Sequence, residues 1–129
     1  MPNDTPATVK PSFTTNIRLD DGSTTLQDET EMVEDHPWFK GTERVLKALL
    51  KRPISETSIV DLGCLNGAYA TGFARLGYNV CGIEVRQSNF DACQYVKSKT
   101  DLPNLEFVKD DARNISKYGS FDVSFCSGL

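Results

Sequence analysis

The chain has 129 residues, which is enough for one domain with a buried core. Apolar residues make up 39% and charged residues 25%, an ordinary globular profile, and the apolar runs are too short to cross a membrane. The net charge is −4 and no basic stripe is present, so the sequence indicates no surface that coats nucleic acid. The cysteines form no C-x-x-C pair and His36 is the only histidine, so we expect buried, reduced thiols and no metal site.

The first 35 residues differ in composition from the rest. Residues 1–35 carry eight acidic and two basic groups and few large apolar side chains, which predicts an acidic, largely flexible segment. Residues 16–22 end in Asp-Gly and suggest a small hairpin with residues 23–26. An alternative is a lid that folds over a ligand site. The segment lacks the basic and apolar stretches of a secretory signal, so we expect a cytoplasmic protein.

Residues 36–129 are expected to form the domain, beginning with a helix. Two apolar sets recur at helical spacing, one starting at Trp38 and the other at Phe39. Pro37 suits the first turn of this helix, and Pro53 stops it. Both aromatic residues could line a site entrance, but core positions are more usual for aromatic residues on a helix.

The remaining sequence alternates between strand and helix patterns. We expect strands at 58–62, 78–83, 105–108 and 121–126, helices at 66–76 and 88–99, and a helical turn at 112–118. Strand–helix–strand units of this length form parallel sheets with right-handed crossovers. The predicted fold is therefore α/β, a Rossmann-like doubly wound parallel sheet with four strands. Such sheets bind ligands beyond the carboxyl ends of their strands.

The loop after the first strand carries two glycines and an acid. Gly63 allows a tight turn, and Gly67 opens a helix whose free N–H groups favour a negative ligand group. Asp61 places a carboxylate at the strand end, where it suits a ligand ammonium group. An ordinary strand-to-helix turn would explain the glycines equally well.

Two further strand ends carry acids. Glu84 lies 17 residues beyond Gly67, near the spacing of a ribose-binding acid, and this interpretation is favoured over a solvated surface glutamate. Asp110 and Asp111 follow the third strand, and either could accept a hydrogen bond from an adenine amino group or cap the next segment. The choice between them stays open on the residues alone.

Residues 37–129 resemble the class I S-adenosylmethionine-dependent methyltransferases, through four segments in order: Asp61-Leu62-Gly63-Cys64-Leu65-Asn66-Gly67, Glu84, Asp110-Asp111-Ala112 and Phe121-Asp122-Val123. An acid two residues before the first glycine separates this pattern from the nicotinamide-binding G-x-G-x-x-G loop. Leu65 departs from the pattern, because many family members have glycine there.

The resemblance implies a cofactor, S-adenosylmethionine, and a role for each matching residue. Asp61 would contact the methionine amino group, and the backbone from Gly63 through Cys64 and Leu65 to Gly67 would pass beneath the methionine moiety. Glu84 would bind the ribose hydroxyls and Val85 would cover the adenine. Asp111 is preferred to Asp110 for the adenine amino group because it directly precedes Ala112, whose backbone would lie at the ring edge. Cys126 and Ser127 would lie near the sulfonium.

The family fold would continue beyond the fourth strand, so we expect the chain to be the N-terminal, cofactor-binding half of a methyltransferase domain. An apolar fourth strand at the sheet edge would leave it marginally stable. The methyl acceptor is favoured to be a small molecule, and no catalytic base can be assigned. The alternatives are a nucleotide- or NAD-dependent oxidoreductase and a non-catalytic binding module.

Overall fold

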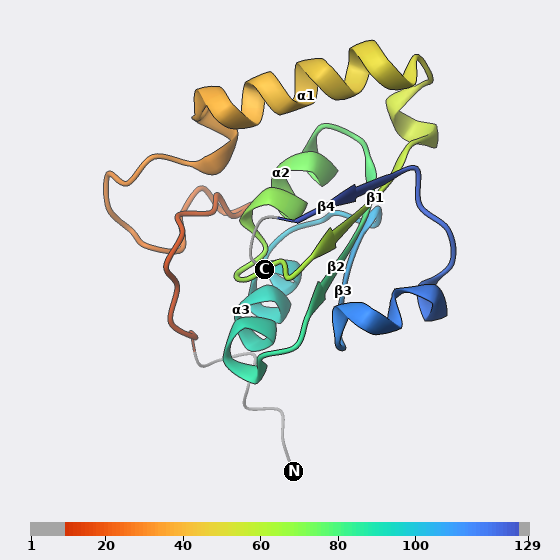
Figure 1. The fold of residues 1–129 in the computed structure, drawn as a ribbon. Coiled ribbons are helices and arrows are strands. Elements are labelled where there is room, and N and C mark those ends of the chain that lie inside the picture. Colours follow the sequence, from red (N-terminus) through yellow and green to blue (C-terminus); the bar gives the residue numbers. More distant parts are fainter. Residues whose placement is uncertain (1–9, 127–129) are drawn as a thin grey trace.

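A computed structural model describes residues 10–126. Its centre is a parallel sheet with the strand order β3-β2-β1-β4, flanked by helices (Figure 1). The strands are β1 (Ser58–Leu62), β2 (Asn79–Glu84), β3 (Leu105–Lys109) and β4 (Val123–Phe125). The helices are α1 (Pro37–Leu50), α2 (Ala68–Arg75) and α3 (Gln87–Ser98), with 3-10 segments η2 (Val33–Asp35), η3 (Ile54–Glu56) and η4 (Ala112–Tyr118). The predicted α/β class, a doubly wound parallel sheet with four strands, is confirmed.

Element bounds follow local chemistry. The α2 helix begins at Ala68 rather than at 66, because Gly67 has a left-handed φ of +90°. The β4 strand is shorter than the predicted 121–126, because the Asp122 carboxylate accepts the Ser58 N–H at 2.8 Å and an Arg52 N–H at 2.8 Å before the ladder begins. Within the described residues, β4 forms one edge of the sheet.

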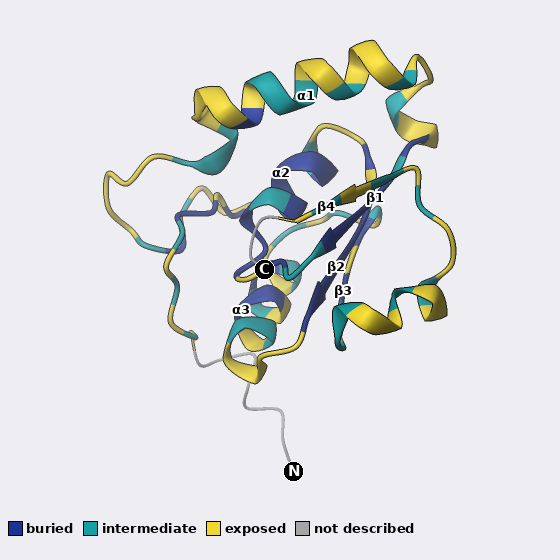
Figure 2. Cartoon of the chain, viewed as in Figure 1, coloured by how far each residue is buried: buried dark blue, intermediate teal, exposed yellow. Residues whose placement is uncertain are grey.

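The core lies mainly between the sheet and the helices. Burial is concentrated in β1, β2 and α2, whereas the outer surface of α1 is exposed (Figure 2). The Phe39 ring of α1 is buried and lies 4.7 Å from the Phe73 ring of α2, centroid to centroid. A smaller cluster around Val60, Cys81 and Ile83 packs on the opposite face against residues of η4 and the loop that follows it.

The N-terminal segment differs from the expectation. Residues 1–9 lie outside the described residues, but residues 13–20 and Val33 pack against the domain instead of remaining loose. Ile17 and Leu19 are buried. The buried Asn16 side chain accepts Leu26 N–H through Oδ1 and donates Nδ2–H to the Thr30 carbonyl. The suggested hairpin is present as a single bridge between Arg18 and Thr24. A few apolar anchors therefore compensate for an acidic composition.

Two glycines give a matched test of how tightly the core is packed. A Cβ at Gly82 in β2 would lie 2.7 Å from Phe107 Cδ1 and 2.9 Å from Cys64 Sγ, so we expect Gly82→Ala to lower the free energy of unfolding by about 1–3 kcal/mol. Gly41→Ala in α1 meets nothing closer than Arg44 at 4.0 Å and should be neutral or stabilising by up to about 1 kcal/mol. Denaturant unfolding measures both, and equal effects would contradict the packing.

Candidate functional site

The sheet reverses its winding at β1, which has β2 on one side and β4 on the other. Asp61 lies in register with Gly82 of β2 and Phe125 of β4, and it is fully buried. Glu84 ends β2 next to the loop that follows β1. The structure thus brings the two predicted acids and the glycine loop to the carboxyl edge of the sheet, where ligands bind in this class of fold.

The loop between β1 and α2 is a tight turn with left-handed residues at Gly63 (φ +69°), Leu65 (φ +54°) and Gly67 (φ +90°). Gly63 N–H and Cys64 N–H both donate to the Ile83 carbonyl, at 2.8 and 3.1 Å, which ties the turn to β2. A Cβ at Gly67 would lie 2.7 Å from Phe107 Cζ. Conformation and packing both require glycine at 67. Leu65, the departure from the family pattern, adopts the conformation that glycine takes at least cost.

The Glu84 carboxylate is 4% exposed and is held by donors from two sides. Oε1 accepts Leu65 N–H at 2.8 Å, and Oε2 accepts Arg86 N–H at 3.0 Å and Asn89 Nδ2–H at 3.4 Å. A carboxylate has about four acceptor positions, so at least one remains for a hydroxyl donor. The fixed carboxylate beside a glycine turn therefore fits a ribose.

Two residues expected at the adenine are accessible or near the surface. Val85 follows Glu84 and is exposed, so its side chain is open to a ligand ring. Ala112 begins η4 and is partly exposed.

The two adjacent aspartates have different partners. Asp110 accepts bonds from Asn114 and Tyr118, which hold the pKa of its carboxyl well below the ordinary value. Asp111 caps η4 through Arg113 N–H at 2.9 Å and pairs with the exposed Arg113 guanidinium, which also lowers its pKa. A solvent-exposed ion pair of this kind contributes little free energy, so releasing the Asp111–Arg113 pair costs less than releasing the partners of Asp110.

The cysteines differ in exposure. Cys64, Cys81 and Cys93 are buried as expected, but Cys126 is exposed at the end of β4, which within residues 10–126 pairs along its β1 side alone. Cys64 Sγ lies 3.7 Å from Cys93 Sγ, and this contact together with burial raises the pKa of the Cys64 thiol. Its side chain therefore packs inward, and only its backbone is placed for a ligand. Ser127 lies outside the described residues.

The two aromatic residues at the start of α1 differ in their exposure to solvent. Phe39 is 2% exposed and belongs to the core. Trp38 is 52% exposed, and its ring contacts Tyr69 and Phe125, with centroids at 5.5 and 5.7 Å. Only Trp38 therefore remains for the entrance interpretation.

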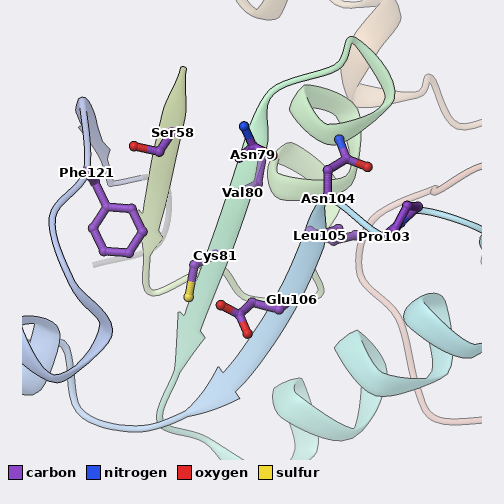
Figure 3. A pocket seen from close by; sticks show the side chains of 9 residues that line it. All are labelled: Ser58, Asn79, Val80, Cys81, Pro103, Asn104, Leu105, Glu106 and Phe121. Atoms are coloured by element: carbon purple, nitrogen blue, oxygen red, sulfur yellow. The ribbon is translucent and has the colours of Figure 1, made fainter. Parts of the chain in front are cut away.

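A groove of about 340 Å³ lies at the amino ends of the strands, opposite the candidate site (Figure 3). Ser58, Asn79 and Leu105, the first residues of β1, β2 and β3, line it together with Cys81 and Glu106. Burial raises the pKa of Cys81 to about 12, so its thiol is no nucleophile. The groove is at the amino ends of the strands, away from the candidate site.

Sequence reasoning missed two amides at the site. Asn66 lies in the glycine turn and Asn89 in the first turn of α3, where its Nδ2–H reaches Glu84. Single amides give no spacing signal in a sequence. Within residues 10–126, no group of three metal-ligating side chains is close enough to hold an ion, and no helix is long and apolar enough to cross a membrane.

The sheet, the glycine turn and the strand-end acid define a doubly wound α/β domain with a candidate ligand site at the carboxyl ends of its strands. Residues 59–129 match the family described as "Methyltransferase domain". The match covers more than half of the chain, and the chain belongs to this family.

Curated relatives carry one activity in their names. The chain is 32% identical over 76 residues to the ubiquinone biosynthesis O-methyltransferase of Albidiferax ferrireducens, covering 57% of the chain and 30% of that protein. It is 29% identical over 73 residues to the enzyme of the same name from Rickettsia bellii, with the same coverage. The chain thus spans about 30% of the length of these relatives.

Solved structures share the fold. The N-terminal domain of EvdMO1, determined in the presence of SAH (S-adenosylhomocysteine) and D-fucose, aligns with a TM-score of 0.59 and 28% identity, covering 74% of this chain and 41% of that one. WbdD aligns with a TM-score of 0.59 and 21% identity over 76% of this chain and 22% of that one, which shows a common fold.

The left-handed turn makes a prediction about Leu65. Leu65 and Leu76 are similarly exposed, at 38% and 45%, but their φ angles are +54° and −79°. Glycine relieves a left-handed strain of about 1–2 kcal/mol only at 65. We expect Leu65→Gly to leave the free energy of unfolding unchanged or slightly higher, and Leu76→Gly to lower it by about 1 kcal/mol. A larger loss at 65 than at 76, in denaturant unfolding, would show that the turn differs from this geometry.

Proposed function

We propose that this chain supplies the cofactor-binding part of an S-adenosylmethionine-dependent methyltransferase that methylates an oxygen atom of a small molecule. The observation that carries the proposal is the buried Glu84 carboxylate, fixed beside the glycine turn by Leu65 N–H and Arg86 N–H. Family membership and the SAH-containing neighbour support the cofactor. The names of the curated relatives support an oxygen acceptor.

The cofactor supplies a methyl group activated on a sulfonium, so the chemistry asks the protein mainly for alignment. Glu84 accepts hydrogen bonds from the ribose hydroxyls, and its fixed orientation requires little reorganisation on binding. Asp61 places negative charge beneath the turn, toward an ammonium group. The backbone from Gly63 to Gly67 shapes the floor of the methionine subsite, with Cys64 and Leu65 contributing main-chain atoms.

The remaining proposed contacts complete the nucleoside site. Val85 covers one face of the adenine, Asp111 accepts from its amino group after releasing Arg113, and the Ala112 backbone lies at the ring edge. Cys126, at the end of β4, lies near the sulfonium of the cofactor. No side chain in residues 10–126 is assigned as a general base. The acceptor's own acidity decides whether one is needed.

The oxidoreductase alternative is less favoured, because the matched family is a methyltransferase family and the loop lacks the G-x-G-x-x-G glycines. A non-catalytic binding module would keep the nucleoside site without an acceptor site. Ligand binding separates the first alternative from the proposal, and methyl transfer separates the second.

Calorimetric titration with SAH and with NAD tests the proposed cofactor. We expect SAH to bind and NAD not to bind, and Glu84→Ala to weaken SAH by roughly 10- to 100-fold, because hydrogen bonds to a charged group are lost. Glu106→Ala is the matched control, since that carboxylate lies in the groove at the other edge. Binding of NAD, or SAH affinity that survives Glu84→Ala, would contradict the proposal.

A further inference from the structure

Residues 13–20 form a strap across α2 and α3. The Phe13 ring meets the Tyr95 ring of α3 edge-on, with centroids 5.9 Å apart, and Ile17 is buried with Ala68 and Val96. At its far end, the Asp20 carboxylate accepts Arg75 Nη2–H at 3.1 Å and Asp101 N–H at 2.7 Å. The strap lies outside residues 59–129, which carry the family match.

The strap is bonded to the glycine turn through Asn66. Asn66 Oδ1 accepts Thr14 N–H at 2.7 Å, Thr14 Oγ1–H at 3.1 Å and Thr15 Oγ1–H at 3.3 Å. The Asn66 side chain is 3% exposed, although it stands next to the exposed Leu65. These three donors are the contacts that let a polar amide be buried at this point of the turn.

Asn66 continues the chain of bonds toward Glu84. Asn66 Nδ2–H donates to Asn89 Oδ1 at 3.3 Å, and Asn89 Nδ2–H donates to Glu84 Oε2 at 3.4 Å. Each amide turns its oxygen toward the strap and its nitrogen toward the carboxylate, so donors and acceptors alternate along the whole chain. The hydrogen bonds from Asn66 to Asn89 and from Asn89 to Glu84 are long and therefore individually weak. The shorter bond from Thr14 N–H to Asn66 Oδ1 must therefore hold the two amides in place.

The same turn contacts Glu84 directly. Leu65 N–H donates to Glu84 Oε1 at 2.8 Å, and the Leu65 carbonyl accepts Cys93 Sγ–H at 3.0 Å. Leu65 and Asn66 are consecutive, so a shift of Asn66 moves the Leu65 N–H that orients the carboxylate. The strap therefore acts on both oxygens of Glu84, on one through Leu65 and on the other through Asn89.

We propose that the strap is part of the cofactor site: Thr14 and Thr15 fix Asn66, and Asn66 and Asn89 are positioning residues that hold the turn and the Glu84 carboxylate ready for the ribose. This inference rests on the proposed function. It assigns a role in nucleoside affinity to residues 13–15, which lie outside the turn and whose hydrogen bonds to it go to Asn66.

SAH titration of the 129-residue chain tests the strap with two variants, their combination and a control. The double variant Thr14→Val/Thr15→Val removes both hydroxyl donors and keeps the side-chain shape, and Asn89→Leu removes the amide that reaches Glu84. We expect each to weaken SAH by about three- to tenfold, and their combination to weaken it by less than the product of the two. Thr42→Val on α1, whose hydroxyl donates to the Trp38 carbonyl within the same helix, should leave the affinity unchanged. Unchanged or tighter binding, or fully multiplicative losses, would overturn the proposal.

Amide hydrogen exchange tests the same relay without a ligand. Asn89→Leu should speed exchange of the Thr14 amide, whose acceptor is Asn66 Oδ1, and spare the Thr25 amide, which donates to the Ile17 carbonyl at 3.0 Å. Unchanged Thr14 exchange would overturn the relay. If the unmodified chain fails to bind SAH while Thr14 exchange responds, the proposed function fails and the relay stands. If SAH binding depends on Glu84 but is unchanged in the strap variants, the proposed function stands and the role of the strap in the cofactor site fails.

Discussion

The hydrogen bond from Leu65 N–H to the Glu84 carboxylate joins the two halves of the candidate site. It connects the turn after β1 to the end of β2, and it depends on the left-handed residues that carry the chain from Gly63 to Gly67. Burial makes an unpaired carboxylate costly at this position, so the turn and the acid stabilise each other. The acid is thereby oriented before any ligand arrives, which lowers the reorganisation needed on binding.

Packing behind the turn sets this geometry. Phe107 of β3 fills the space that side chains at Gly67 and Gly82 would occupy, and the Cys64–Cys93 contact closes the gap between the turn and α3. The strap adds a third support from outside the sheet. The site therefore rests on β1, β2, β3, α3 and the N-terminal segment together, although the residues expected to touch the cofactor come from a few loops.

The sequence was sufficient for the fold and for the strand-end acids, because both depend on short-range patterns. The short buried run at 58–62 predicted β1 with its observed bounds, and β2 was predicted at 78–83, one residue before the observed strand that ends at Glu84. The strap could not be predicted in this way. Its anchors, Ile17 and Asp20, meet residues 50 or more positions away, and an acidic composition masked them. The side-chain amides of Asn66 and Asn89 could not be predicted for the same reason, because their role depends on contacts and not on spacing in the sequence.

We expect a nucleoside to bind at the carboxyl ends of the strands, against Glu84. Chemical-shift mapping of the ¹⁵N-labelled chain, titrated with SAH, tests it most directly. We expect the amide shifts to concentrate at Gly63, Leu65, Val85 and Ala112, with a smaller response at Thr14. Shifts centred on Ser58, Cys81 and Glu106, in the groove at the amino ends of the strands, would place the ligand there and contradict binding against Glu84.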